Sequence, residues 1–217
     1  MSKQWASLAA FVNDANAAGD WVLLRDPAEG DDIDILCANK DTFTKRLGLQ
    51  KRNTGISAYQ ASIADVCTPV DVRFVGDGYY DEAWQEAMLS NRNLTTDHCP
   101  VLNDNDSFYS LLYHAQVHKY KTQQKYKPML QRLAKKIGHT YTPQSLQIFL
   151  QEHKYTTVTP LDVSVRFNMP RRFQKGIPVK YRMLHALTRW PFCSLVRIVP
   201  RSIKLYVQHK MLPSEHT

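Results

Sequence analysis

Two aspartates, Asp32 and Asp34, have the residue type and the spacing of a metal site. They open the run of residues 32–37, which follows the apolar run of residues 21–25 after a polar turn. Both runs predict β-strands, and alternate side chains of a strand share a face. Adjacent carboxylates on a buried sheet repel each other and resist losing water, and a divalent cation removes both penalties. The alternative is an ordinary solvated pair, but the apolar residues between and after the carboxylates favour the metal site.

A third carboxylate, Asp71, lies in a later run that alternates apolar and polar residues from 69 to 76. This alternation predicts a strand with Asp71 and Arg73 on one face. If this strand pairs beside that of Asp34, the three carboxylates converge and supply ligands for one or two Mg²⁺ or Mn²⁺ ions. Two-metal sites clamp the attacking and leaving oxygens of phosphoryl transfer. We therefore predict Asp32, Asp34 and Asp71 as metal ligands and catalytic residues; the alternative for Asp71 is an edge-strand charge.

The order of strand, turn, "DIDIL" and a later strand with one more Asp resembles the nucleotidyltransferase superfamily, which has the DNA polymerase β-like fold. Within it, "LLRDPAEGDDIDIL" is most similar to the LicD-type phosphocholine transferases and fukutin-like proteins. The resemblance covers residues 18–76. It implies that Asp32 and Asp34 are metal ligands, that Asp71 is the third carboxylate, and that Arg25 lies near the substrate phosphates. It also implies a nucleotide or nucleotide-linked donor.

The sequence departs from this family at the place where phosphate is usually bound. The superfamily carries a Gly-Ser or Gly-Gly pair ahead of the acidic run, where backbone N–H groups bind phosphate. Here residues 23–26 read Leu-Leu-Arg-Asp. We expect the guanidinium of Arg25 to take over part of this role as a bidentate donor.

Charge is divided sharply along the 217-residue chain. Residues 1–118 hold 9 Lys and Arg against 17 Asp and Glu, whereas residues 119–217 hold 19 against 3. An acidic half suits metal binding, and a basic half suits anionic substrates or an anionic membrane. The alternative is two solvated surfaces that merely balance.

Two histidines, His114 and His118, are four residues apart in a strongly periodic helix predicted to begin at Asn105–Asp106. This spacing puts both rings on one helix face. The sequence lacks the Glu of an H-E-x-x-H zinc motif and offers no obvious third ligand. We therefore expect first that the two histidines pack or form hydrogen bonds within the fold. A third interpretation is that His118 and Lys119 face substrate phosphates. With Arg25 and Arg73, they complete the predicted donor-binding set.

The expected organisation has three parts: an α/β core (1–103), a helical companion (104–168) and a basic amphipathic tail (169–217). Residues 161–167 alternate like a strand, and residues 181–206 predict short amphipathic helices that dock on the core, bind an anionic membrane or bind nucleic acid. Four widely spaced cysteines and the lack of a signal segment or membrane span predict a cytoplasmic protein with free thiols, peripheral to the inner membrane face.

Together these observations predict an α+β fold, in which a nucleotidyltransferase-like mixed sheet is flanked by helices and followed by a mainly helical basic region. The expected function is Mg²⁺-dependent transfer of a nucleotidyl or phospho group, which the resemblance places in surface glycan or lipid-linked glycan modification. One alternative is a toxin/antitoxin-type nucleotidyltransferase that acts on RNA or protein. Another is a binding module with a degenerate site.

Overall fold

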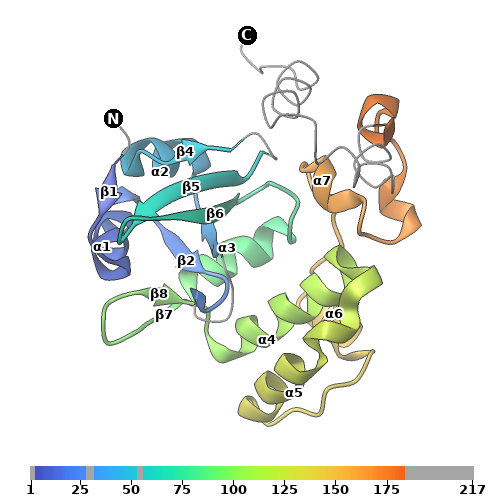
Figure 1. The fold of residues 1–217 in the computed structure, drawn as a ribbon. Coiled ribbons are helices and arrows are strands. Elements are labelled where there is room, and N and C mark those ends of the chain that lie inside the picture. Colours follow the sequence, from blue (N-terminus) through green and yellow to red (C-terminus); the bar gives the residue numbers. More distant parts are fainter. Residues whose placement is uncertain (1–2, 28–31, 53–55, 184–217) are drawn as a thin grey trace. The chain divides into compact units, whose positions relative to one another are not determined.

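The computed structural model describes residues 3–27, 32–52 and 56–183. The chain forms two compact units, residues 1–173 and 174–217. In the described part of the first unit, a mixed open sheet is flanked by helices, in agreement with the expected α+β class (Figure 1).

The sheet brings together strands that are far apart in the sequence. Its order is β1-β5-β6-β3-β2-β8-β7, with β4 paired to β5. β3 runs parallel to β6 and antiparallel to β2, so it lies at the centre. The strands are β1 (Gln4–Trp5), β2 (Trp21–Leu23), β3 (Ile33–Cys37), β4 (Gln50–Lys51), β5 (Ala58–Ile63), β6 (Val66–Phe74), β7 (Asn93–Leu94) and β8 (Pro100–Val101).

Polar side chains define where several helices begin. Asn39, Asp81 and Asn103 each accept a hydrogen bond from a main-chain N–H in the first turn that follows, which satisfies a donor with no partner inside the helix. The helical elements are α1 (Leu8–Ala18), α2 (Lys40–Leu47), α3 (Glu82–Ser90), α4 (Asp104–Tyr113), η2 (His114–His118), η3 (Tyr120–Tyr126), α5 (Lys127–Lys136), α6 (Ser145–Glu152), α7 (Val163–Arg166) and η4 (Arg171–Gln174).

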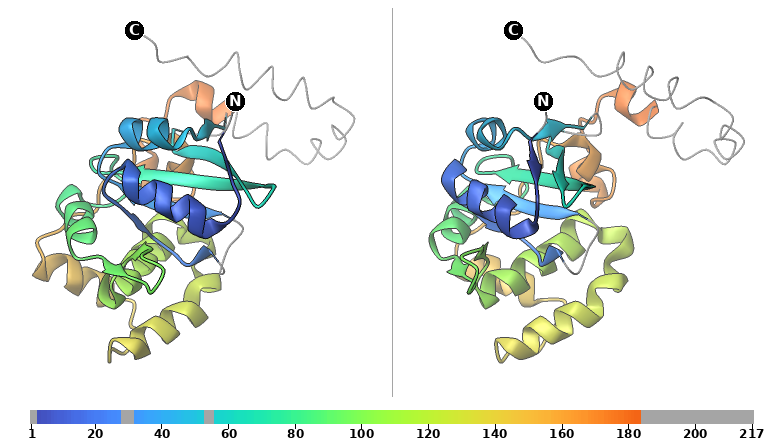
Figure 2. Two further views of the ribbon diagram at one scale, coloured as in Figure 1. Left: turned by 90° about the vertical axis from the view of Figure 1, so that its left-hand side faces the viewer. Right: turned by 60° about the vertical axis from the view of Figure 1, so that its left-hand side comes forward.

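Each face of the sheet has its own apolar core. Ile33, Ile35, Val70 and Val72 are buried together with the apolar residues of α1 and α2. Leu36, on the opposite face, is buried with residues of α3, α4, α5 and α6. The strand alternation therefore points Asp34 and Asp71 towards the layer that contains α3–α6. Figures 1 and 2 show α4, α5 and α6 together on one side of the sheet.

The predicted strand at residues 161–167 is wrong. The structure has the short helix α7 here, because the Asp162 carboxylate caps the main-chain N–H of Ser164 at 2.9 Å. Leu161 instead donates its N–H to the carbonyl of Asp77 at 2.9 Å, which ties this segment to the end of β6. The alternating apolar and polar residues 161–167 therefore form a capped helical turn and not a strand.

Other expectations fall partly on residues that are not described. Residues 28–31 of the polar turn and residues 184–217 of the basic tail lie outside the described set, as does Cys193. Cys37, Cys67 and Cys99 are free thiols. Within the described ranges, no helix combines the length and the apolar character that crossing a bilayer requires.

Two glycines with the same φ test how closely Thr159 approaches the turn that follows β6. Gly78 and Gly138 both have φ of +69°, but a Cβ on Gly78 would lie 2.6 Å from the Thr159 carbonyl oxygen, whereas Gly138 has nothing within 4 Å. Both Ala substitutions carry left-handed strain of about 1–2 kcal/mol. We expect Gly78→Ala to cost a further ~1–3 kcal/mol of unfolding free energy from the steric clash.

Urea unfolding of Gly78→Ala, Gly138→Ala and the parent chain measures this difference. Equal losses for the two variants would show that the approach of Thr159 to Gly78 is not as close as described.

Candidate metal and anion site

Three carboxylates meet where β3 and β6 lie side by side. Asp34 is the register partner of Asp71 across the parallel pair, and Asp32 immediately precedes β3. One oxygen from each carboxylate lies within 4.8 Å of the other two. Asp32 is exposed, while Asp34 and Asp71 are half-buried. The predicted pairing of the two strands is therefore present, and it brings the three predicted metal ligands together.

Burial on the reverse face fixes this register. Ile35 and Val72 are register partners and are both 0% exposed. Ile33, which is also buried, pairs with Val70, which is 0% exposed. A slip of one residue would turn these apolar side chains to the polar face and the aspartates into the core. The apolar core under α1 and α2 thus holds the carboxylates opposite each other.

Arg25 contacts this group from the end of β2. The antiparallel pairing of β2 and β3 continues through a hydrogen bond from the Leu24 N–H to the Asp34 carbonyl at 2.9 Å. Beyond it, Nη1 of Arg25 donates a hydrogen bond to the Asp34 carboxylate and forms an ion pair with it. Burial alone would lower the pKa of Arg25, but Asp34 and nearby tyrosines outweigh it and raise the pKa. Arg25 therefore remains a cation beside the carboxylates.

Arg73 is a second cation on the same face, and its guanidinium is almost fully buried. It lies 3.8 Å from Asp71 and 3.7 Å from Asp162, and it donates a hydrogen bond to Ser57 Oγ at 3.0 Å. It also lies over the Tyr79 ring, 4.1 Å from the centroid. A buried charge is tolerated when paired and hydrogen-bonded in this way. Burial opposes ionisation, but Tyr79 and the two carboxylates raise the pKa of Arg73 on balance.

The donor set suits a hard divalent cation. Burial raises the pKa of Asp71, Arg73 opposes this rise, and repulsion from Asp34 and Asp32 adds to it. Two cationic side chains therefore do not remove the electrostatic cost of bringing the carboxylates together. Mg²⁺ and Mn²⁺ prefer oxygen ligands, and the three nearby groups supply only carboxylate oxygens.

Behind Arg73 lies a buried cluster of aromatic rings and histidines. α4 does not continue as a regular helix: residues 114–118 form a π-helical turn, closed by a hydrogen bond from the Lys119 N–H to the His114 carbonyl at 2.8 Å. His114 Nδ1 is hydrogen-bonded to the Tyr79 hydroxyl at 2.7 Å and its Nε2 to the Tyr126 hydroxyl at 3.1 Å. π-helical turns occur frequently at functional sites.

The zinc interpretation of the two histidines finds no support in this arrangement. Both ring nitrogens of His114 are occupied by tyrosine hydroxyls. His118 is 1% exposed, and its ring centroid lies 3.8 Å from that of Tyr79. Among the residues described, neither of its ring nitrogens has a hydrogen-bond partner. His118 therefore packs against the Tyr79 ring in the interior of the fold.

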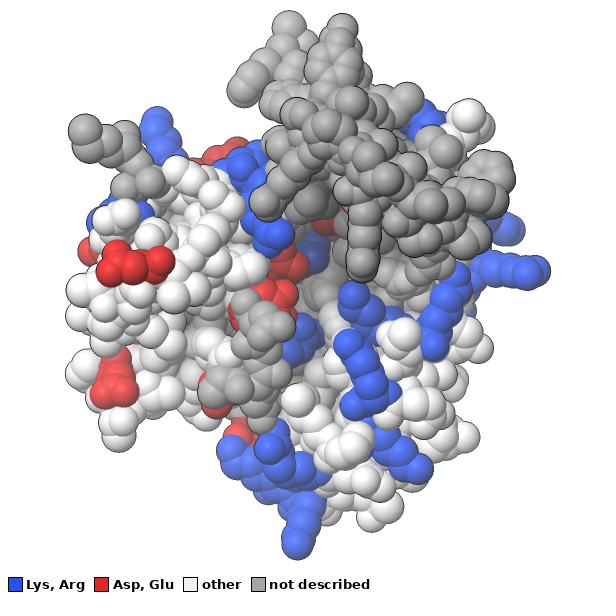
Figure 3. Space-filling model, in the orientation of Figure 1, with Lys and Arg blue, Asp and Glu red and all other residues white. Residues whose placement is uncertain are grey.

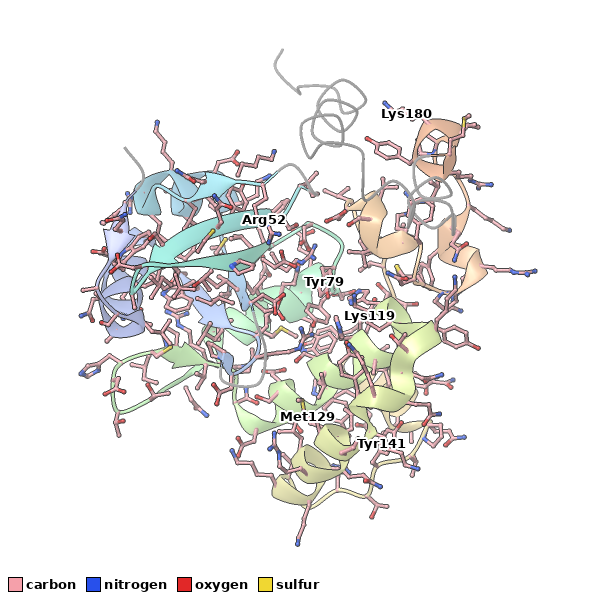
Figure 4. The ribbon with its side chains drawn as sticks, viewed as in Figure 1. Arg52, Tyr79, Lys119, Met129, Tyr141 and Lys180 are labelled. Atoms are coloured by element: carbon pink, nitrogen blue, oxygen red, sulfur yellow. The ribbon has the colours of Figure 1, made fainter. Side chains whose placement is uncertain are left out.

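Lys119 is the member of the pair that reaches the carboxylate side. It is half-buried, and Figure 4 shows it next to Tyr79 where the sheet meets the helical layer. Burial lowers the pKa of Lys119, as do Lys125, Arg25 and Arg73, whereas Asp34 opposes the change. The structure thus gathers three of the four predicted donor-binding groups, Arg25, Arg73 and Lys119, around the acidic site, with His118 buried behind them.

Sequence reasoning missed the groups that hold Arg73. Ser57, Tyr79 and Asp162 come from three separate segments, and nothing in their local sequence marks them as its partners. The position of Asp162 follows from the capping of α7 and from the Leu161–Asp77 hydrogen bond, which are both tertiary features.

We compared the chain with family models, curated proteins and solved structures and found no match.

The buried histidines predict a loss of stability in mild acid. Burial lowers the pKa of His114 and His118 well below the usual value, and the nearby Arg73 and Arg25 add to this for His118. The unfolded chain binds these protons near pH 6.5, and the folded chain does not. Stability is therefore complete above about pH 6.5 and falls as the pH drops below it, by up to about 1.4 kcal/mol per pH unit for each histidine.

Melting temperatures of the parent chain and of His118→Phe between pH 7.5 and 5 test this. We expect the variant to lose part of the pH dependence, since one titrating group has gone. The exposed His139 provides the control His139→Phe. A parent chain whose stability does not change across this range would contradict the burial of these rings as neutral groups.

Proposed function

We propose that the chain is a Mg²⁺- or Mn²⁺-dependent nucleotidyl- or phospho-group transferase with a nucleotidyltransferase-like fold. The observation that carries this proposal is the register of β3 and β6, which sets Asp34 opposite Asp71 with Asp32 alongside. Further support comes from Arg25 and Lys119, which are cations within electrostatic reach of the same carboxylates. Carboxylates for metal and cations for phosphate are the two requirements of phosphoryl transfer.

Asp32, Asp34 and Asp71 would hold the metal. When bound, the metal would neutralise phosphate charge and lower the pKa of a coordinated hydroxyl. Arg25 and Lys119 would bind the donor phosphates through charge-assisted hydrogen bonds. Arg73, held by Ser57 and Asp162, would keep Asp71 in place and support the predicted donor site together with His118.

The transfer step is a substitution at phosphorus. A hydroxyl oxygen of the acceptor forms a bond to the donor phosphorus, and the bond to the leaving group, diphosphate for a nucleoside triphosphate donor, breaks. The hydroxyl proton passes to a carboxylate, for which we assign Asp71.

The acceptor that the resemblance implies is a surface glycan or lipid-linked glycan, modified at the cytoplasmic membrane face with the basic tail nearby. A second candidate is RNA or protein, as in toxin/antitoxin-type nucleotidyltransferases. The observation that favours an anionic polymer is the absence of Asp and Glu from residue 119 to residue 151, a segment that holds seven Lys and Arg.

The decisive substitution is Asp34→Asn, which removes the charge of a proposed metal ligand while keeping its shape. We expect Mg²⁺-dependent transfer from a radiolabelled nucleoside triphosphate to fall by on the order of 10³-fold, because several kcal/mol of transition-state stabilisation are lost. The control is Asp65→Asn, in the exposed turn between β5 and β6, where φ is +62° and Asn is also tolerated. Full activity of Asp34→Asn in a folded protein would disprove the mechanism.

A thermal-shift screen separates a transferase from a binding module with a degenerate site. Ligands that bind the folded state raise the melting temperature in proportion to the logarithm of their concentration. We expect Mg²⁺ or Mn²⁺ with a nucleoside triphosphate or a CDP-linked donor to stabilise the parent chain more than Asp34→Asn. The same shift in both proteins, or none in either, would favour the binding module.

A further inference from the structure

The exposed charged side chains of η3 and α5 are all basic, although one of them, Lys136, forms an ion pair with Asp104 of α4 at 2.7 Å. Exposed basic side chains follow one another along residues 120–136, and no acidic residue occurs in this segment. We call this set of residues the 120–136 surface; its exposed basic side chains are Lys121, Lys125, Lys127, Arg132, Lys135 and Lys136. Figure 3 shows Lys and Arg gathered over the part of the face where α5 lies, below an acidic group near its centre. Such a surface attracts a polyanion.

The apolar side of α5 is not available to a membrane. Leu130 and Ala134 are buried, and Met129 and Leu133 pack against the core under the sheet. An interfacial helix needs apolar side chains on the face that it turns to the lipid. The outward residues of α5 are instead basic or amide side chains, such as Lys127, Gln131 and Lys135. A hydrated polymer of phosphates therefore fits this surface better than a lipid surface.

An exposed aromatic ring on the same surface favours a polymer that carries flat bases. Tyr120 lies between Lys119 and Lys121 and is 52% exposed. Proteins that bind single strands combine cations that contact the backbone with aromatic rings on which bases stack. A phosphorylated glycan has no base to stack on Tyr120, whereas single-stranded RNA has one at every residue.

The surface also begins at the acidic site. Lys119 immediately precedes Tyr120, and Figure 4 shows Lys119 next to Tyr79, whose ring lies under the guanidinium that contacts Asp71. From Lys119 the basic side chains continue along η3 and then along α5, whose ten residues span about 15 Å. A strand that lies on this surface therefore has one end directed towards the three carboxylates.

We propose that the 120–136 surface binds single-stranded RNA and presents a ribose hydroxyl of that strand to the site of Asp32, Asp34 and Asp71. This inference rests on the proposed function and narrows its acceptor to RNA. The chemical step is unchanged: the ribose oxygen forms the new bond to the donor phosphorus, the leaving group departs with its electron pair, and the hydroxyl proton passes to Asp71.

Fluorescence anisotropy of a labelled, unstructured oligouridine strand measures binding to the full chain. We expect the double variant Lys127→Glu/Lys135→Glu to weaken binding at least tenfold and to reduce the salt dependence, by roughly 0.7 in the slope of log K against log salt for each lost phosphate contact. The control Lys45→Glu/Lys51→Glu makes the same charge change on α2 and β4 and should bind as the parent does. Equal weakening by both variants would overturn the proposal.

Tyr120 distinguishes RNA from other polyanions. Tyr120→Ala should weaken oligouridine binding by between about fivefold and a hundredfold through loss of stacking, while Tyr120→Phe retains it. Binding of inorganic polyphosphate should not respond to Tyr120→Ala. An unchanged affinity of Tyr120→Ala for RNA would show that the surface serves another partner. The same conclusion would follow if the Lys127→Glu/Lys135→Glu variant lost more affinity for anionic vesicles than for RNA.

Asp34→Asn separates this inference from the proposed function. It should bind oligouridine as the parent does and fail to extend or modify it. Metal-dependent transfer to another acceptor, with RNA binding independent of the 120–136 surface, would reject the RNA inference and leave the transferase intact. RNA binding through that surface with no metal-dependent transfer in the parent chain would reject the transferase and leave the RNA surface intact.

Discussion

The parallel pairing of β3 and β6 is the constraint on which the site depends. It is imposed from the far side of the sheet, where Ile35 and Val72 are completely buried under α1 and α2. Apolar packing thus fixes two half-buried carboxylates, Asp34 and Asp71, in an arrangement that electrostatics alone would oppose. The surrounding cations, and the metal that we propose, offset a repulsion that the core enforces.

Arg73 connects this acidic group to the rest of the first unit. Its guanidinium contacts Asp71 within its own strand, Ser57 before β5, Tyr79 after β6 and Asp162 at the start of α7. A buried cation with partners from four segments is destabilising if any one partner is lost, because the charge cannot regain water. The geometry of the carboxylates is therefore coupled to the position of a helix that is remote in the sequence.

Local patterns predicted much of this fold. Alternating side chains identified β3 and β6, but their pairing was only a condition of the metal-site hypothesis, because like charges on one face do not favour it; the buried Ile35 and Val72 on the other face do. Sequence patterns could not identify Asp162 as a partner of Arg73, because residues 161–167 alternate as a strand does. The helix α7 forms here because Asp162 caps the Ser164 N–H and Leu161 donates a hydrogen bond to Asp77. They also could not separate the roles of His118 and Lys119, because the predicted regular helix is interrupted at this point.

That interruption sets the direction of the chain that follows. The π-helical turn of residues 114–118 contains one residue more than the α-helical turn it replaces, and Lys119 then leaves the helical conformation with φ of −116° and ψ of 35°. Removing one residue there would restore regular α-helical hydrogen bonds and change the direction in which Lys119 leaves the helix. Local helix stability and the placement of Lys119 are thus opposed, and the less regular backbone is the one that sets Lys119 where the sheet meets the helical layer.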